Sequence, residues 1–387
     1  MVRNRPILLA AIKAAFQRSQ AVALVGARQC GKTTLARQFA SAQANATFFD
    51  AESPADLARL ANPTLTLGQA KGLVVIDEIQ RVPELFPVLR VLLDDPKSKT
   101  RWLLLGSAAP ELVRGVSETL AGRLAFVDIA GFDLREIDPV GELNRLWIRG
   151  GLPRSFLSSD DGSSLDWRTD YARTFLERDL PNLGIRVTPA ALRRFWSMVA
   201  HWHGQIWSAA EFARALGSSE PTARHHLDIL CGALVVRQLQ PWHANLAKRQ
   251  VKSPKIYVRD SGVLHALLDL PSRDQVLGHV KCGASWEGFI IEQILACTGD
   301  RQAWFWGTHG GAELDLLLTG GGRRVGVEIK LTDAPTVTPS MRIALKDLKL
   351  EHLHVIHAGN RSYPLDDRIT ATAARDLLGV FSNWKRP

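Results

Sequence analysis

The amino-acid sequence predicts an α/β protein that begins with a parallel sheet. Short apolar runs at 21–25, 73–76 and 102–105 are typical of strands buried on both faces of such a sheet. The segments between them, such as 35–42 and 83–93, have the residue pattern of helices. With 387 residues, 46% of them hydrophobic, the chain has material for two or three domains of about 150 residues each.

The first of these strands leads into a glycine-containing turn that precedes a helix. The turn fits the pattern G-x-x-x-x-G-K-[ST], which predicts a phosphate-binding loop when a strand and a helix flank it. Successive backbone N–H groups and the positive end of the helix would then face one anion. The sequence therefore predicts a nucleoside-triphosphate site formed by Gly26, Ala27, Arg28, Gln29, Cys30, Gly31, Lys32, Thr33 and Thr34.

Four side chains near this loop have predicted roles in phosphoryl transfer. Lys32 is expected to reach the β- and γ-phosphates, and the Thr33 hydroxyl to bind Mg²⁺. The apolar run at 73–76 leads directly into Asp77 and Glu78, as expected where a buried strand ends at a nucleotide cleft. We expect Asp77 to hold the Mg²⁺ shell through water, and Glu78 to polarise the water that attacks the γ-phosphate.

Three further polar residues are candidates for the same site. Ser107 ends the strand at 102–107 and would sense the γ-phosphate or orient the attacking water; a simple turn at the strand end is the alternative. Arg114 or Arg123 could stabilise transition-state charge, in its own site or in that of a neighbouring chain. For each arginine, a surface or structural ion pair is the alternative.

Four segments occur in an order that resembles a known family. They read Gly-Ala-Arg-Gln-Cys-Gly-Lys-Thr-Thr, Val-Ile-Asp-Glu-Ile-Gln, Gly-Ser-Ala-Ala…Thr-Leu-Ala-Gly-Arg and Trp-Ile-Arg-Gly-Gly-Leu-Pro. Together they resemble prokaryotic AAA-type ATPases (AAA_14) that carry a C-terminal domain of unknown function, DUF4143. The resemblance implies a P-loop core with an additional strand, ATP as the nucleotide, Asp77 and Glu78 as the Walker B pair, and Ser107 at the sensor-1 position. Cys30 stands where family members usually carry Val, a mild departure at a position that contributes mainly backbone.

Composition limits the cellular setting and the partners. The net charge of +9 permits a polyanionic partner, and DNA is the partner that we expect. The four cysteines form no C-x-x-C pair, which argues against disulfides and a cysteine zinc site and favours the reducing cytoplasm. No apolar run reaches the roughly 18 residues of a membrane span, and the N-terminus lacks a signal-peptide pattern. We therefore expect a soluble cytoplasmic protein without a membrane partner; AAA-type ATPases often form rings, so a homo-oligomer is an open possibility.

The middle of the chain predicts a helix-turn-helix. A helix that contains Phe212 ends at Gly217, a short turn follows, and a second helix begins near Glu220 with Pro at a first-turn position. Apolar residues at 235–239 then predict a wing-like hairpin. The candidates for contact with phosphates or base edges are Arg224, His225 and His226. Packing between domains is the alternative role for this segment.

A basic stretch at 245–260 follows the predicted hairpin. Its lysines and arginines suit a phosphate backbone, while a solvated face is the alternative; they are Lys248, Arg249, Lys252, Lys255 and Arg259. Glycine and small polar residues at 150–153 and 158–164 mark a domain boundary. The predicted division is an ATPase domain at 1–155, a helical bridge at 156–200, a winged-helix-like segment at 201–260 and a second α/β domain at 261–387.

The last part of the chain predicts a helix, a strand and a glycine hairpin that together carry acidic residues. Strand alternation places Glu313 and Asp315 on one face, and Glu328 and Lys330 on one face of the next strand. Two carboxylates that hold a metal, with a lysine that positions the attacking water, meet the requirements of Mg²⁺-assisted phosphodiester hydrolysis. The arrangement resembles the restriction-endonuclease-like PD-(D/E)XK superfamily, which implies catalytic roles for Asp315, Glu328 and Lys330, metal binding by Asp315 and Glu328, and a fourth acid, Glu287, on the preceding helix.

Two functional hypotheses follow from these patterns. The first is an Mg²⁺-dependent AAA-type ATPase that acts on DNA, with phosphodiester cleavage by the C-terminal domain. The second is an ATP-gated regulatory or interaction protein whose nuclease-like fold is catalytically inactive. A DNA-binding transcription factor is a third idea, which ATP turnover without DNA would contradict.

The histidines at 352 and 354 predict a strand rather than a metal cluster.

Overall fold

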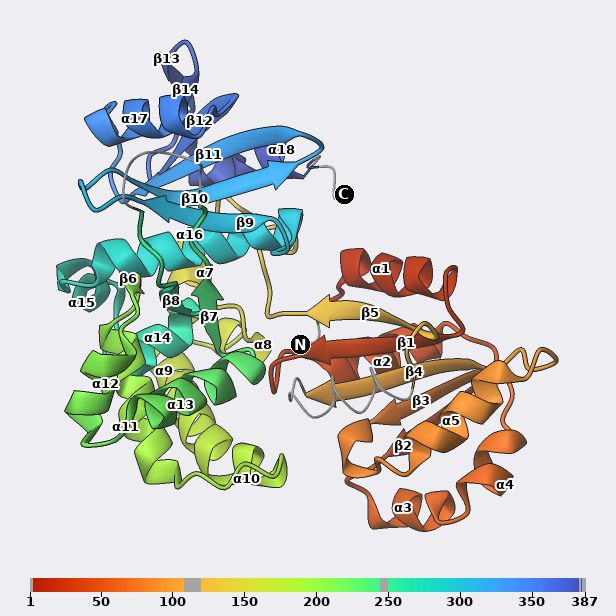
Figure 1. The fold of residues 1–387 in the computed structure, drawn as a ribbon. Coiled ribbons are helices and arrows are strands. Elements are labelled where there is room, and N and C mark those ends of the chain that lie inside the picture. The colour runs from red at the N-terminus through yellow and green to blue at the C-terminus, as the bar shows by residue number, and fades with distance from the viewer. Residues whose placement is uncertain (1–2, 108–119, 244–249, 383, 385–387) are drawn as a thin grey trace. The chain divides into compact units, whose positions relative to one another are not determined.

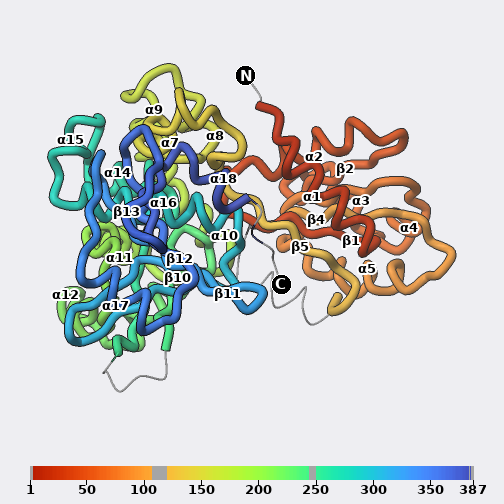
Figure 2. Tube along the Cα trace, turned by 90° about the horizontal axis from the view of Figure 1, so that it is seen from above, coloured from red at the N-terminus to blue at the C-terminus, as the bar shows by residue number. Residues whose placement is uncertain are grey.

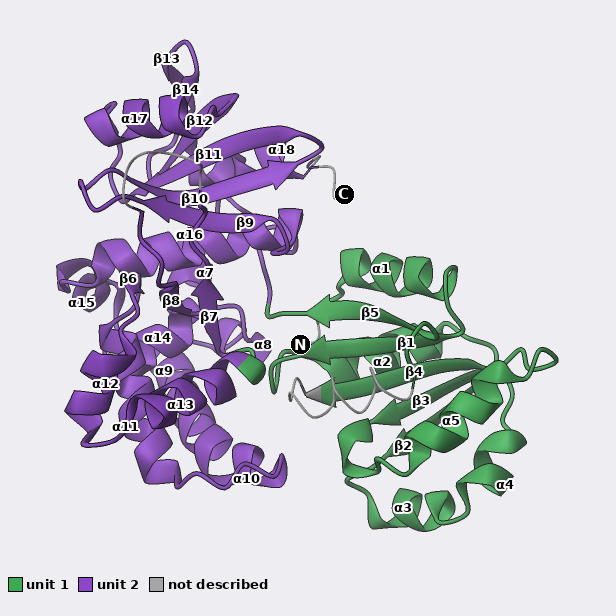
Figure 3. Cartoon of the chain, viewed as in Figure 1, with its two compact units in different colours: residues 1–131, 232–234 green, residues 132–231, 235–387 purple. Residues whose placement is uncertain are grey.

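A computed structural model describes residues 3–107, 120–243, 250–382 and 384 of the chain. It divides into two compact units (Figure 3). Unit 1 consists of residues 1–131 and 232–234, and unit 2 of residues 132–231 and 235–387. The division of the sequence into four parts stays a prediction. No described helix combines the length and the apolar character that a membrane crossing requires.

Unit 1 contains a five-stranded sheet in the order β2-β3-β4-β1-β5, and all of its neighbouring strands pair in parallel (Figure 1). The predicted α/β class with a parallel sheet is thus confirmed. The strands are β1 (Ala21–Gly26), β2 (Ala46–Asp50), β3 (Leu73–Asp77), β4 (Arg101–Ser107) and β5 (Leu124–Ile129). The described helices are α1 (Pro6–Phe16), α2 (Lys32–Ser41), α3 (Pro54–Leu60), α4 (Pro63–Gly68) and α5 (Leu85–Asp94), with a 3₁₀ turn at Ile79–Arg81.

The sheet order determines what surrounds the loop that follows β1. Because β1 lies between β4 and β5, the carboxyl ends of those two strands flank this loop. Helix α1 contacts β1 and β5 (Figure 2), and α2 contacts β1, β3 and β4. The apolar residues of α5 join those of β3 and β4 in one buried core, which fixes the strands that position the site.

The first part of unit 2 is mainly helical and includes a small antiparallel sheet in the order β6-β8-β7. Its helices are α7 (Leu143–Arg149), α8 (Pro153–Phe156), α9 (Asp161–Thr174), α10 (Leu180–Asn182), α11 (Pro189–His201), α12 (Ala209–Leu216) and α13 (Glu220–Gly232), with a π-helical turn at Phe175–Asp179. Its strands are β6 (Gln205–Ile206), β7 (Val236–Leu239) and β8 (Lys255–Val258). The elements therefore follow the order α11-β6-α12-α13-β7-β8.

The rest of unit 2 is built on a six-stranded mixed sheet in the order β13-β14-β12-β11-β10-β9. Its strands are β9 (Ala303–Gly307), β10 (Glu313–Gly320), β11 (Arg323–Lys330), β12 (His352–His357), β13 (Tyr363–Asp366) and β14 (Ile369–Ala373). The helices of this part are α14 (Ser261–Leu267), α15 (Arg273–Gly278), α16 (Cys282–Thr298), α17 (Pro339–Asp347) and α18 (Leu377–Phe381), with a 3₁₀ turn at Ala374–Asp376. Figure 1 shows α16 and α17 on opposite sides of this sheet.

Candidate functional site

The predicted phosphate-binding loop connects the end of β1 to the start of α2. Gln29 and Gly31 have positive φ angles of 61° and 99°, so the backbone turns sharply before the helix begins at Lys32. Gly26 lies against β5, where a Cβ atom would stand 2.1 Å from the carbonyl oxygen of Ile129. The first glycine of the loop is therefore required by close packing, and the second by backbone conformation.

The Lys32 ammonium lies over this loop. Its Nζ donates hydrogen bonds of 2.9 Å to the carbonyl oxygens of both Gly26 and Ala27, and the residue is only 6% exposed. Both carbonyl groups are neutral, so neither of these two hydrogen bonds balances the positive charge of Lys32. An anion bound in the loop would balance that charge, which fits the predicted contact with phosphates.

Thr33 and Asp77 are brought together from α2 and β3. The Thr33 hydroxyl donates a 2.7 Å hydrogen bond to Oδ2 of Asp77, and the backbone N–H of Glu78 donates to Oδ1 at 3.0 Å. Burial raises the pKa of Asp77, and the hydrogen bond from Thr33 opposes that rise. A hydroxyl and a carboxylate in contact at this edge of the sheet are suitable oxygen ligands, direct or through water, for the Mg²⁺ of a bound nucleotide.

Glu78 follows β3 with a left-handed backbone, at φ 51° and ψ 44°. Its Oε1 accepts a 2.9 Å hydrogen bond from Nη1 of Arg28, a residue of the phosphate-binding loop itself. Its Oε2 accepts a hydrogen bond from Nε2 of Gln80. The predicted general base thus lies beside the loop with both carboxylate oxygens engaged.

The structure describes the remaining candidates of this site only in part. Ser107 ends β4 and pairs in register with Gly26, but its side chain lies outside what is described, as does the whole of Arg114. Arg123 forms a two-point ion pair with Asp94 of α5, with N–O distances of 2.6 and 2.9 Å. This is the ion-pair alternative for Arg123, whose catalytic role stays a prediction.

One buried arginine near the loop was not identified from the sequence. Arg5 is 5% exposed and donates to the carbonyl oxygens of Cys30, Ala130 and Gly131 at 2.9–3.1 Å. It therefore ties the loop to the segment after β5. Cys30 is itself fully buried, and its backbone carbonyl takes part in this network, in keeping with the mainly backbone role that was expected.

The predicted helix-turn-helix corresponds to α12 and α13. Gly217 ends α12 in the left-handed conformation. On α13, Arg224 is exposed and pairs with Glu220 at 3.0 Å, and His225 is exposed as well. His226, in contrast, is 7% exposed and packs edge-on against Phe195, and burial lowers its pKa. The prediction that His226 faces phosphates or bases is wrong, because its ring belongs to the core of the helices.

The carboxylates predicted in the last part of the chain do converge. Asp315 on β10 lies one step beyond the Leu316–Val327 pair of the hairpin, which places it opposite Glu328 on β11. Oδ2 of Asp315 accepts a 2.8 Å hydrogen bond from the backbone N–H of Ile329. Lys330 pairs with Oε1 of Glu328 at 2.7 Å.

Two residues of β8 enter the same cluster. The Tyr257 hydroxyl donates a 2.6 Å hydrogen bond to Glu287 of α16. Lys255 pairs with Glu287 at 3.2 Å, with Glu313, and with Asp315 at 3.9 Å. Lys255 was expected in a basic surface patch, but it is 4% exposed and surrounded by acids, so that prediction is wrong. We call Glu287, Glu313, Asp315, Glu328, Lys255 and Lys330 the carboxylate cluster.

Burial and like charge shift the pKa values of this cluster. Burial raises the pKa of Asp315 well above its usual range, and the nearby Glu287 and Glu328 add to the rise. Burial likewise raises the pKa of Glu328, against the opposing effect of Lys330.

Throughout the described part of the chain, no three His, Cys, Asp or Glu side chains are arranged to hold a metal ion. His352 and His354 instead form hydrogen bonds with Thr370 and Thr372 on β14.

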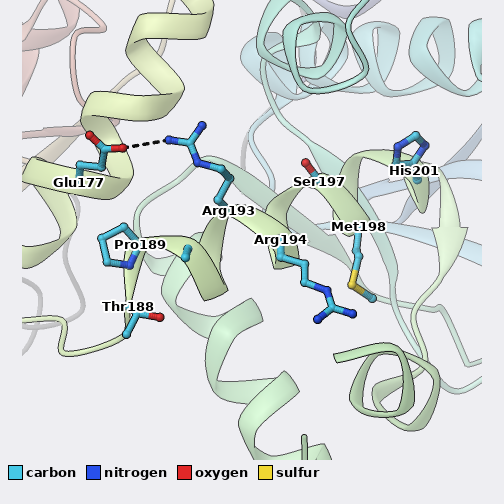
Figure 4. Close-up of a pocket in the computed structure, with 9 residues that line it drawn as sticks. Glu177, Thr188, Pro189, Arg193, Arg194, Ser197, Met198 and His201 are labelled. Atoms are coloured by element: carbon cyan, nitrogen blue, oxygen red, sulfur yellow. Dashed lines mark hydrogen bonds and ion pairs between the residues drawn. The ribbon is translucent and has the colours of Figure 1, made fainter. Parts of the chain in front are cut away.

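A separate hollow of about 780 Å³ lies along α11. Figure 4 shows Arg193 pointing toward Glu177, and Arg194, Met198 and His201 further along the same helix. Arg193 and Glu177 form an ion pair at 3.2 Å. None of the residues that line it is a predicted site residue, so it is not part of either site described above.

A protein-family model supports the fold of unit 1. The family model described as an AAA domain matches residues 18–138, and domains of unknown function match residues 140–274 (DUF8612) and 282–377 (DUF4143). Among solved structures, a Walker-type ATPase of Pyrococcus abyssi is 15% identical with a TM-score of 0.49, over 69% of this chain and 96% of that one. The RuvB Holliday junction branch migration motor of Thermotoga maritima is 17% identical with a TM-score of 0.31, over 61% and 90% of the two chains. Scores this low identify no shared function.

Two mycobacterial relatives are much more similar in sequence. The uncharacterized proteins Rv2008c of Mycobacterium tuberculosis and Mb2031c of Mycobacterium bovis are each 48% identical over 378 residues, which is 98% of this chain and 85% of the relative. Identity of this extent places all three in one family. The chain therefore belongs to the same family as these mycobacterial proteins, and it is an AAA-like P-loop ATPase with a C-terminal DUF4143 domain.

Proposed function

We propose that the chain binds Mg²⁺-ATP in the loop at 26–34 and hydrolyses it with Glu78 as the general base. The observation that carries the proposal is the contact of Thr33 with Asp77 at the carboxyl edge of the parallel sheet, next to a loop whose carbonyl groups hold Lys32. Thr33 and Asp77 would hold the Mg²⁺ of the bound nucleotide, whose chemistry there is to neutralise phosphate charge. Lys32 would exchange its two carbonyl contacts for phosphate oxygens, a charge-assisted and therefore stronger interaction.

Glu78 takes part in two different sets of contacts under this proposal. In the structure, its oxygens are held by Arg28 and Gln80. To take a proton from the attacking water, a lone pair of one carboxylate oxygen must point at that water, and the bonds to Arg28 and Gln80 fix where both oxygens now point. We infer that hydrolysis requires Glu78 to separate from Arg28, and that this step limits the basal rate.

Nucleotide binding and steady-state ATP hydrolysis test the proposal. Thr33→Ala should lose Mg²⁺-dependent hydrolysis, and Lys32→Ala should lose ATP affinity as well. Lys13→Ala, which removes an exposed lysine from α1 of the same unit, is the control and should match the wild type. ATP hydrolysis that continues in Thr33→Ala and Lys32→Ala would contradict the assignment.

DNA is the partner that we propose for unit 2. The order α11-β6-α12-α13-β7-β8, a helix-turn-helix with strands on either side, supports a winged-helix arrangement, and α13 carries exposed Arg224 and His225. The net charge of +9 favours a polyanion. Lys248 and Arg249 of the basic stretch lie outside the described residues. The formation of a homo-oligomer stays a prediction.

The test of this proposal is DNA affinity at several salt concentrations. Arg224→Ala with His225→Ala should weaken binding and reduce its salt dependence, because fewer phosphate counterions are released. Arg273→Ala, an exposed arginine of α15, is the matched control. Equal DNA affinity in all three proteins, or none in the wild type, would favour the alternative of an ATP-gated module with a protein partner.

Phosphodiester cleavage by the carboxylate cluster stays a prediction, which the contacts of Lys255 do not support.

A further inference from the structure

Lys255 lies where the carboxylates of the DUF4143 domain converge. It comes from β8, outside that domain, and is 4% exposed. Its Nζ contacts acids from two different elements: Glu287 of α16, and Glu313 and Asp315 of β10. The ammonium therefore lies among the oxygen atoms that a divalent cation would need.

The carboxylate cluster contains more acidic than basic side chains. Four carboxylates and two lysines make up the cluster, and Lys330 pairs with Glu328. Oε2 of Glu328 is buried and has no hydrogen-bond partner among the described residues. Carboxylate oxygens are suitable ligands for Mg²⁺ or Mn²⁺, but three of the four carboxylates already contact Lys255. The cluster in this arrangement does not fit a bound divalent metal.

We propose that Lys255 is the resident cation of the carboxylate cluster, so that the cluster joins β8 to the C-terminal sheet instead of holding a divalent metal. An ammonium supplies three donors and one charge at a fixed place, whereas a metal would need several of the same oxygens within about 2.0–2.6 Å. The two cations would need the same carboxylate oxygens, so they cannot occupy the site together.

The charge state of Lys255 agrees with this role. Burial alone would lower the pKa of Lys255, but Tyr257 and the carboxylates of Glu287, Asp315 and Glu313 raise it well above its usual value. Lys255 is therefore charged at neutral pH. Removing it would leave buried carboxylates without their partner, a costly change that a divalent cation could offset.

Mn²⁺ binding to the full chain tests the proposal, measured without nucleotide by the loss of the free-ion electron paramagnetic resonance signal. Asp77→Asn is present throughout, so that the nucleotide site contributes no metal ligand. With Lys255 intact, we expect no Mn²⁺ binding that depends on Asp315. With Lys255→Met, we expect a single Mn²⁺ site with an affinity at least about tenfold above that of any Mn²⁺ binding by the protein with Lys255, since one charge among close carboxylates contributes more than the 1.4 kcal/mol of a tenfold change. Adding Asp315→Asn should abolish that site.

Lys252→Met is the matched control, because Lys252 is an exposed lysine three residues earlier in the same segment. It should leave both Mn²⁺ binding and the thermal midpoint unchanged. Mn²⁺ binding that is present with Lys255 intact and lost with Asp315→Asn would overturn the proposal. So would a folded Lys255→Met protein that gains no Mn²⁺.

A second measurement applies if Lys255→Met alone does not fold. Glu287→Gln removes the negative charge that Lys255 faces on α16, so the double variant Lys255→Met, Glu287→Gln should fold and show a cooperative thermal transition. A double variant that also fails to fold would show that the two charges are not coupled, and would overturn the proposal.

Discussion

Replacement of Arg28 by methionine should raise the basal rate of ATP hydrolysis. Arg28 holds Oε1 of Glu78 at 2.9 Å, and the two side chains are only 14% and 13% exposed. A hydrogen bond between charged groups contributes about 1.5–3 kcal/mol net. An interaction of that size leaves the Glu78 carboxylate separated from Arg28 in at most about a tenth of the molecules, since 1.4 kcal/mol is a factor of ten.

The expected increase in kcat is therefore about tenfold if separation limits the basal rate. Gln80 still holds the other oxygen of Glu78, which argues against a larger effect. The assay is steady-state ATP hydrolysis over a range of ATP concentrations, so that kcat and KM are obtained separately. Arg59→Met is the control, because Arg59 pairs with Asp56 at 2.8 Å and not with the acids that contact Arg28, so its removal should leave kcat unchanged.

The opposite result would refute the reasoning. If Arg28→Met lowers kcat while KM stays constant, Arg28 acts in the transition state, and its contact with Glu78 does not restrain the base. A rise in KM alone would mean that Arg28 contributes only to nucleotide binding.

Two further predictions concern packing and pH. Gly26→Ala should cost about 1–3 kcal/mol of stability and weaken ATP binding, because its Cβ would stand 2.1 Å from a backbone oxygen of β5; Gly68→Ala, whose Cβ would meet nothing within 4 Å, is the control for urea unfolding and ATP titration. His265 is fully buried between Ile148 and Ser285, and burial lowers its pKa to about 4 from 6.5. The folded state therefore binds fewer protons than the unfolded state below pH 6.5, and stability should fall by about 2 kcal/mol between pH 7 and pH 5 through this residue. Urea unfolding of the wild type and His265→Gln at both pH values measures this contribution, and an equal loss in the two proteins would contradict it.

Local sequence patterns predicted the elements that form the nucleotide site. The loop at 26–34 and the strand before Asp77 are recognisable because a buried parallel strand is wholly apolar and its end is marked by polar residues. The edge strand β5 was missed because its exposed face carries the apolar Phe126, which is 48% exposed, so the residue types do not follow the alternation in burial. Periodicity alone does not distinguish so mixed a strand from a loop.

Contacts between distant residues were beyond the sequence. Lys255 reads as part of a basic surface stretch, and only the pairing of β6, β7 and β8 brings it to acids 32 to 60 residues later in the chain. Arg28 and Glu78 are 50 residues apart, and nothing local indicates that they pair. His226 was misassigned because the pattern of α13 gave no reason to separate it from exposed His225.

Single-turnover hydrolysis of Mg²⁺-ATP by Glu78→Gln tests the central claim most directly, because product release does not enter the measured rate. We expect the rate to fall by about 10²–10⁴, the usual contribution of a general base, while the affinity for ATP stays that of the wild type. Glu84→Gln, at the start of α5 and exposed, should hydrolyse ATP normally. A Glu78→Gln protein that hydrolyses ATP at the wild-type rate would contradict the assignment of Glu78 as the base.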